Sequence, residues 1–379
     1  MDEILSSIVG TDGLILGTIV PFLFVLTVVV FVHEMGHYLV GRWCGIGVKA
    51  FSIGFGPELF GFNDRHGTRW KLSAIPLGGY VKFTGDMNAT STPDPEEIES
   101  LSEDEKKVAF HTQPVWKRAL TVVAGPVFNF LLTIAVFAVL FGTYGKPVVQ
   151  PVVAEVVSGS AAEAAGFKPG DRFVSVDGSP VETFADVQRY VSGRTDDPLV
   201  FTMMRDGNEI TLTATPRLTE QKDALGNTIK VGVIGVATNQ EVGEGRVEHY
   251  GPLEAVGQAV AETGSIIART GQFLKRFAFG REDKCQLGGP IKIAKLSGQA
   301  AQLGFLWLIN LVALLSVGIG FLNLLPIPPL DGGHLLFYGI EAATRRPVPE
   351  RAMDAVYRIG FLAVLLFMAF VVWNDLFGC

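Results

Sequence analysis

Four apolar stretches constrain this chain more than any other feature of its sequence. They run from about Leu14 to Val40, Ala119 to Phe141, Leu303 to Leu325 and Val356 to Trp373. Each is long enough to cross a bilayer as a helix, which takes about 20 residues. Charged residues make up only 18% of the chain, against about 25% in soluble proteins. The sequence therefore predicts a polytopic α-helical membrane protein with four transmembrane helices.

The first apolar stretch can be mistaken for a signal peptide. Its leader, MDEILSSIVGTDG, carries acidic residues and neither Lys nor Arg, whereas a signal peptide begins with a positively charged region. The stretch is also long for a signal peptide, and it carries ionisable residues at its far end. We expect it to be retained as the first transmembrane helix.

Basic residues beside the apolar stretches predict the orientation of the chain, because Lys and Arg collect on the cytoplasmic side. They lie between the first and second stretches and between the third and fourth, at Arg42, Lys49, Lys117, Arg118, Arg345, Arg346 and Arg351. Both of these loops should be cytoplasmic. Both termini and the region between the second and third stretches should then be extracytoplasmic.

The segments outside the membrane have different characters. Residues 48–83 alternate apolar and polar side chains and are rich in glycine, which predicts a membrane-associated β-hairpin region on the cytoplasmic side. Residues 88–107 are acidic and rich in Pro, Ser and Thr, which predicts a solvated linker. The external segment from Pro147 to Pro216 reads as short strands, helices and turns of one small α+β domain.

The chain thus divides into four predicted parts. They are a first membrane part, the external domain, an amphipathic segment and a second membrane part, at residues 1–145, 146–217, 218–302 and 303–379.

Two other features exclude classes of function. The net charge is −7 and no basic stripe with interleaved aromatic residues is present, so we expect no nucleic-acid partner. The three cysteines, Cys44, Cys285 and Cys379, are far apart and odd in number. They predict neither a disulfide framework nor a cysteine zinc site.

A short motif in the first apolar stretch points to chemistry. His33, Glu34 and His37 form an HExxH sequence, in which the two histidines share one face of a helix. Such a pair can bind one metal ion, typically zinc, while Glu34 lies beside it to accept a proton from water. Ionisable groups within a membrane helix are costly and usually functional. We therefore predict a catalytic zinc centre and reject a chance match.

A catalytic zinc site needs a third protein ligand. The candidates lie in NLLPIPPLDGGH, from Asn323 to His334, at the end of the third apolar stretch. Asp331 follows a helix end broken by prolines and precedes two glycines, and the predicted topology puts it on the same side of the membrane as the histidine pair. His334 is a rival on chemistry alone. Two histidines with one carboxylate are a familiar catalytic zinc set, which favours Asp331.

Together these motifs resemble the site-2 protease family, in the branch of the bacterial regulator of sigma-E protease. The external AAGFKPGD run, followed by VDG, resembles a bacterial PDZ domain. Further matches are SIGFGP, IPLGGYVK, PVWKR and AGPVFNF, at residues 52–57, 75–82, 114–118 and 124–130. The resemblance covers nearly the whole chain, with one PDZ-like segment where the enterobacterial member has two.

The resemblance implies both an activity and a set of site residues. His33, His37 and Asp331 would bind zinc, Glu34 would be the general base, and His334 would be a structural neighbour. The protein would be an endopeptidase of the bacterial inner membrane that cuts transmembrane segments of single-pass proteins. These substrates would be trimmed first by another protease, and anti-sigma factors and leftover signal peptides are examples.

The resemblance also places Asn323 and Asn129 near the substrate. Either amide could instead bond a neighbouring membrane helix. The hairpin residues Gly54, Phe55 and Gly56 could hold an unwound substrate by strand addition, or the hairpin could be an ordinary one.

Two other classes of function remain open at this point. A catalytically inactive, membrane-tethered PDZ scaffold is disfavoured because HExxH and Asp331 are all present. A transporter is disfavoured because the sequence has no inverted repeat.

Overall fold

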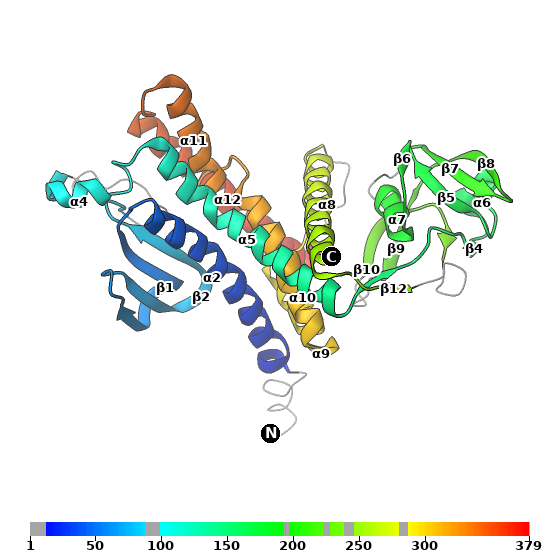
Figure 1. Cartoon of the computed structure of the whole chain (residues 1–379), viewed down its shortest axis with the longest axis horizontal. Helices are drawn as coiled ribbons and strands as arrows, with labels where there is room; N and C mark the ends of the chain where they lie inside the picture. Colours follow the sequence, from blue (N-terminus) through cyan, green and yellow to red (C-terminus); the bar gives the residue numbers. More distant parts are fainter. Residues whose placement is uncertain are drawn as a thin grey trace. The chain divides into compact units, whose positions relative to one another are not determined.

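The computed structural model falls into two compact units. It describes residues 13–87, 99–192, 194, 197–222, 228–238, 246–279 and 287–378. The first unit holds Met1–Phe137, Ala259–Ile267 and Gly288–Cys379, and the second holds Ala138–Gln258 and Ala268–Leu287. Figure 1 labels most of the elements of both units. Cys285, Cys379 and residues 88–98 of the predicted linker lie outside the described residues.

Among the described residues, four helices are long and apolar enough to cross a membrane, and they match the four predicted apolar stretches. They cover Leu16–Trp43, Val115–Thr143, Phe305–Asn323 and Ala355–Phe377. The elements are the π-helix η1 (Leu14–Ile19) with α2 (Val20–Trp43), α5 (Val115–Thr143), α10 (Phe305–Asn323), and α12 (Glu350–Trp373) with the π-helix η3 (Asn374–Gly378). The third span begins later than predicted because Gly304, with a φ of 120°, separates α10 from α9 (Pro290–Leu303).

Small residues bring three of these helices close together. A Cβ on Gly36 of α2 would lie 2.5 Å from the carbonyl oxygen of Ala124 in α5. A Cβ on Gly320 of α10 would lie 3.1 Å from the Cβ of Asn129, also in α5. Small side chains are typical of such close crossings between membrane helices. Because Gly36 belongs to the HExxH motif, α5 crosses α2 at that motif.

The predicted β-hairpin region forms two long antiparallel strands, β1 (Val48–Asn63) and β2 (Arg69–Phe83). The strands bend, so residues 50–53 of β1 pair with 79–82 of β2 on one side and with 69–72 on the other. One hairpin thereby makes a sheet wider than two strands, and the 79–82 segment is its edge.

Two contacts attach this hairpin to α2. Phe51 and Val81 are buried in a cluster that includes Tyr38 of α2. Asp64, in the turn between the strands, accepts hydrogen bonds from the Tyr38 hydroxyl at 2.9 Å and from the Trp70 indole at 3.1 Å. Burial raises the pKa of Asp64, but these and two backbone hydrogen bonds outweigh burial and hold it well below its usual range.

The far end of the hairpin exposes large apolar side chains. Leu59, Phe60 and Phe62 are 68%, 67% and 53% exposed. Exposed apolar groups gathered in this way suit contact with lipid.

The linker prediction at 88–107 needs one correction. The described part of that segment includes a short helix, α4 (Glu103–Val108). Ser102 and Glu105 form a capping box at its start. The spacing of a serine and a glutamate three residues apart is the usual signal for a helix start.

The second unit contains the predicted α+β domain, whose core is a four-stranded sheet in the order β6-β5-β7-β8. Its elements are β4 (Glu155–Val156), α6 (Ala161–Ala165), β5 (Arg172–Val176), β6 (Ser179–Pro180), α7 (Phe184–Ser192), β7 (Leu199–Arg205) and β8 (Asn208–Ala214). Phe167, Phe173 and Phe201 lie in the buried core.

This domain continues beyond residue 217, where the predicted boundary lies. A hairpin of β9 (Arg217–Lys222) and β10 (Thr228–Val233) leads to Ile234, which is buried in the same core. β11 (Val236–Ala237) pairs with β4, and β12 (Arg246–Glu248) pairs with β3 (Lys146–Val148). The chain therefore enters and leaves this domain along paired strands.

Two further helices complete the described elements. α8 (Pro252–Ala278) lies within the predicted amphipathic segment, and α11 (Asp331–Thr344) follows α10 in the second membrane part.

Candidate metal centre

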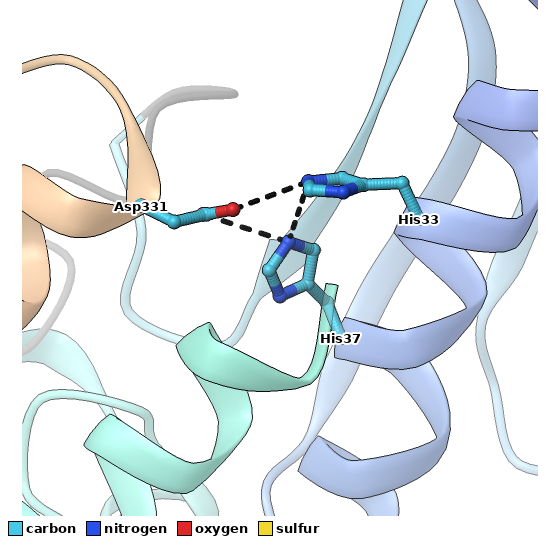
Figure 2. Close-up of side chains that lie close together, drawn as sticks. All are labelled: His33, His37 and Asp331. Carbon is cyan, nitrogen blue, oxygen red and sulfur yellow. Dashed lines mark hydrogen bonds and ion pairs between the residues drawn. The ribbon is translucent and has the colours of Figure 1, made fainter. Parts of the chain in front are cut away.

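Two helices of the first unit supply three side chains that point toward one another. His33 and His37 lie one turn apart on α2, and Asp331 is the first residue of α11 (Figure 2). Both histidines are buried, with 8% of each exposed. The three form the metal-ligating cluster of the described residues. The structure thus brings together the ligand set predicted from the sequence.

The three side chains of this cluster lie close enough together to share one metal ion, and the two histidines lie nearest to different oxygens of Asp331. Nε2 of His33 lies 3.2 Å from Nε2 of His37 and 3.2 Å from Oδ2 of Asp331. Nε2 of His37 lies 3.5 Å from Oδ1 of Asp331. A tetrahedral zinc ion with bonds of about 2.1 Å holds its ligand atoms about 3.4 Å apart. In addition, Asp331 Oδ2 is buried with no hydrogen-bond partner beyond its ion-pair contact with His33, and a metal ion would satisfy it.

The loop before α11 explains why the motif contains Asp331-Gly332-Gly333. A Cβ on Gly332 would collide with the backbone carbonyls of Leu324 and Leu325, and one on Gly333 would lie 2.7 Å from the nitrogen of Pro328. The two glycines therefore let the start of α11 pack against the proline-containing loop, which points Asp331 at α2.

His334, the alternative to Asp331 as the third ligand, lies in different surroundings. Its ring lies beside Tyr357 of α12, with the Tyr357 hydroxyl 2.8 Å from Nδ1 and 3.2 Å from Nε2. It does not belong to the metal-ligating cluster of the described residues. This placement agrees with a structural role.

Helix α5 forms the wall behind the two histidines. The Nδ1 of His37 lies 2.9 Å from the backbone oxygen of Thr121, which can accept its proton and leave Nε2 free for a metal. A Cβ on Gly125 would collide with Nε2 of His37 and lie 2.9 Å from Cε1 of His33. The sequence analysis identified neither the role of the Thr121 carbonyl nor that of Gly125, although Gly125 lies in the AGPVFNF segment that carries part of the family resemblance.

Replacing Gly125 by alanine should therefore empty the metal site. The new methyl group needs the space of the His37 imidazole, so we expect Gly125→Ala protein to purify with most of its zinc missing. Gly142→Ala is the control on the same helix, because its Cβ would meet Ala255 at an ordinary 3.6 Å. Elemental analysis of both proteins measures the effect. Full zinc occupancy in Gly125→Ala would contradict the tight fit described here.

The remaining predicted site residues lie in different surroundings. The Nδ2 atom of Asn323, the last residue of α10, lies 3.4 Å from His33 Nε2. The Asn129 amide is fully buried, 3.3 Å from His33 Nδ1. Glu34 lies against β2, where a Cβ on Gly79 would come within 3.0 Å of Glu34 Cγ.

The predicted hairpin residues lie within β1, outside the metal-ligating cluster of the described part. Gly54 packs against the carbonyl oxygens of Ser73 and Ile75. The Phe55 ring stacks on Tyr80, with 6.0 Å between ring centroids. Their predicted contact with a substrate stays a prediction.

An HExxH helix, a third carboxylate ligand and a glutamate beside the pair are the parts of a zinc-dependent hydrolase. Here the HExxH motif is built into a helix of membrane-spanning length. The fold and site thus define the class of membrane zinc metalloproteases.

Comparison with known proteins identifies the family. Peptidase family M50 matches residues 21–367. A candidate zinc metalloprotease of Mesorhizobium japonicum is 73% identical over 96% of this chain and 100% of its own length. One from Brucella suis is 64% identical over 100% of both chains. Metalloprotease MmpA of Caulobacter vibrioides is 41% identical over 94% of this chain and 95% of its own. The chain belongs to peptidase family M50, the site-2 proteases, and is a zinc metalloprotease.

Among solved structures, the PDZ domain of an SdrC-like protein from Listeria monocytogenes has a weak likeness to this chain. It matches at 16% identity with a TM-score of 0.18, over 28% of this chain and 97% of that domain.

Proposed function

We propose that this protein is an intramembrane endopeptidase that hydrolyses peptide bonds inside the transmembrane segments of single-pass membrane proteins. One observation carries the proposal. The HExxH motif lies within Leu16–Trp43, a helix long and apolar enough to cross a membrane. Ionisable groups are costly at such a place, so a centre built there should act on substrates that are also in the membrane.

We propose an orientation in the bacterial inner membrane with the active site toward the cytoplasm. Both termini and the external domain are then extracytoplasmic, which follows from the positions of the basic residues. At 1.5 Å per helical residue, His33 and His37 lie about 15 and 9 Å from the end of the span at Trp43. This depth is within the membrane, yet shallow enough for a protein-lined path to bring water from the cytoplasm.

Each site residue has a distinct task in hydrolysis. His33, His37 and Asp331 would hold the zinc ion. When bound, zinc would act as a Lewis acid that polarises the scissile carbonyl and the attacking water. Glu34 accepts a proton from that water as its oxygen bonds to the carbonyl carbon, and passes the proton to the departing amide nitrogen as the C–N bond breaks.

Asn323 is suited to assist at the reacting carbonyl. Its amide nitrogen lies near His33 Nε2, the atom that faces the metal position. An N–H group there can donate to the carbonyl oxygen as that oxygen gains negative charge.

A helical substrate must unwind before its carbonyls can react, and a sheet edge can hold the unwound strand. Residues 79–82 of β2 pair with β1 on one side, and Gly79 lies directly beside Glu34. We place the unwound segment along this edge. Gly54, Phe55 and Gly56 then support the edge through Ile75 and Tyr80.

The substrates we propose are single-pass proteins already shortened by another protease, such as anti-sigma factors or leftover signal peptides. The external domain would obstruct a large folded ectodomain. An inactive scaffold would have no need for Glu34 and three complete metal ligands in one cluster, so we do not favour that alternative.

Removing the external domain should widen the range of substrates. Because β3 and β12 pair at its base, residues 149–245 can be replaced by a short Gly/Ser linker. We expect unchanged zinc content, an unchanged rate on a short pre-trimmed substrate, and new cleavage of a substrate with its folded ectodomain.

A rival role for this domain is substrate recruitment through the groove of about 640 Å³ lined by α7 and residues 231–237. A slower rate on the short substrate would support recruitment and contradict the filter.

The proposed activity is tested with purified protein in detergent and a panel of single-pass proteins. We expect cleavage that stops with a zinc chelator and returns when zinc is added. Cleavage that persists after complete zinc removal would contradict the proposal, and so would failure to cut any transmembrane segment.

A further inference from the structure

One face of α5 is turned toward the zinc-binding histidines along two helical turns. Thr121, Gly125 and Asn129 are spaced four residues apart and therefore lie on that face. Thr121 contacts Nδ1 of His37, Gly125 leaves room for both imidazoles, and Asn129 contacts Nδ1 of His33. Each histidine thus has a partner from α5 at the nitrogen that points away from Asp331.

The Asn129 side chain lies in a wholly buried position that a substrate would not reach. It is 0% exposed. Its backbone oxygen accepts hydrogen bonds from the Thr133 hydroxyl at 3.1 Å and the Ser316 hydroxyl at 2.9 Å. The nearby Gly320 has no room to spare, since a Cβ there would lie 3.1 Å from Asn129 Cβ. Residues of α5 and α10 therefore pack closely around Asn129, and His33 of α2 lies at the end of its side chain.

The two ends of the Asn129 amide meet different surroundings. Nδ2 lies 3.3 Å from His33 Nδ1, while Oδ1 is buried without a hydrogen-bond partner. If Nδ2 donated to Nδ1, a neutral His33 would carry its proton on Nε2, the atom that faces His37 and Asp331. That proton would block metal binding, because a ligating nitrogen must offer its lone pair.

Turning the amide over resolves both difficulties. The oxygen and nitrogen of an asparagine amide have nearly the same shape, so the hydrogen-bond network decides which end faces which partner. With Oδ1 toward His33, the oxygen accepts a proton from Nδ1, and the Nε2 lone pair is free for the metal. The same rotation gives the orphaned oxygen a partner and moves Nδ2 to the position that the oxygen held.

We propose that Asn129 is a positioning residue of the zinc site. Its side-chain oxygen accepts a hydrogen bond from His33 Nδ1, fixes the tautomer and ring orientation of His33, and thereby strengthens zinc binding. The Thr121 carbonyl does the same for His37. This inference rests on His33 being a zinc ligand, as in the proposed function. It replaces the predicted contact of Asn129 with substrate by a contact with a ligand.

The test compares zinc affinity in two variants of nearly equal size. Asn129→Leu removes the acceptor, and loss of such a partner typically costs about 10–100-fold in metal affinity. Asn129→Asp keeps an acceptor. We therefore expect it to bind zinc at least about tenfold more tightly than Asn129→Leu, which is the lower end of the range of affinity losses just given. Affinity is measured in detergent by competition with a chromogenic chelator. The visible absorption of cobalt-substituted protein reports the ligand geometry.

A purely structural role predicts the opposite order. A buried carboxylate without a proton donor is costlier than a leucine, so Asp would then be the worse variant. Asn129→Leu binding zinc like the wild type, or Asn129→Asp binding no more tightly than Asn129→Leu, would overturn the proposal. Ser297→Ala is the control, because it removes a buried hydroxyl of α9 that donates to the Ile293 carbonyl of the same helix. Its affinity should equal that of the wild type.

One more variant separates this inference from the ligand assignment. His33→Ala should weaken zinc binding more than Asn129→Leu does. If His33→Ala weakens binding and Asn129→Leu does not, only the positioning role fails. If His33→Ala leaves zinc affinity unchanged, the ligand assignment fails and the positioning role fails with it.

Discussion

Glu34→Gln should abolish cleavage while leaving zinc in place. Glutamine keeps the size of the side chain beside Gly79 but cannot accept a proton from water. General-base groups typically contribute about 10²–10⁴-fold to a rate, and we expect a loss in that range. The three zinc ligands are untouched, so metal content should equal that of the wild type.

The measurement pairs turnover of a short single-pass substrate with elemental analysis of the same preparation. Glu34→Asp is a useful companion, because its carboxylate is set back by one methylene and should retain part of the activity. Rapid turnover by Glu34→Gln would refute the general-base role. Loss of zinc from the same variant would show that Glu34 helps to hold the metal.

Asp331→Ala should remove zinc from the protein. The carboxylate would supply one of three ligand atoms, and its two oxygens lie 3.2 and 3.5 Å from the two histidine Nε2 atoms. Zinc binding to a four-ligand protein site is worth about 10–16 kcal/mol, so one ligand accounts for about 3 kcal/mol. We therefore expect affinity to fall roughly a hundredfold or more.

His334→Ala is the control for this experiment. It removes the contact with Tyr357 and lies three positions along the same helix. We expect it to lower thermal stability in detergent and to keep its zinc. The reverse pattern, with zinc lost from His334→Ala and kept by Asp331→Ala, would show that the wrong residue of this motif has been assigned.

The sequence was sufficient to predict the long apolar helices and the cluster of His33, His37 and Asp331, because local patterns mark both. Twenty apolar residues in a row identify a span wherever the helix packs. HExxH places two imidazoles on one helical face by spacing alone. Asp331 was harder, since His334 offers equally suitable chemistry, and the packing of Gly332 and Gly333 on the preceding loop shows why the aspartate is the residue presented.

The surroundings of the site depend on contacts between distant segments, which local patterns do not encode. The resemblance places Asn129 near the substrate, and the sequence alone leaves a bond to a neighbouring membrane helix as the alternative. Only the crossing of α5 with α2 puts it 3.3 Å from His33. Gly125 is a similar case. Position 125 must lack a side chain because the His33 and His37 imidazoles of α2 need that space.

The domain boundary and the strand register were also less predictable from the sequence than the helices and strands themselves. The α+β domain of the second unit includes β11, which pairs with β4 far back in the chain, so the extent of the domain depends on long-range strand pairing. Likewise, residues 50–53 of β1 pair with two separate parts of β2. Alternation of apolar and polar side chains indicates strands but does not specify such a double register.

The site of hydrolysis within the substrate tests the central claim most directly. Purified enzyme and a short single-pass substrate are incubated in detergent with water enriched in heavy oxygen, and both products are analysed by mass spectrometry. The account predicts one new carboxyl terminus inside the apolar membrane-spanning stretch of the substrate, carrying heavy oxygen, and none with Glu34→Gln. Cleavage confined to the polar segments outside that stretch would contradict it.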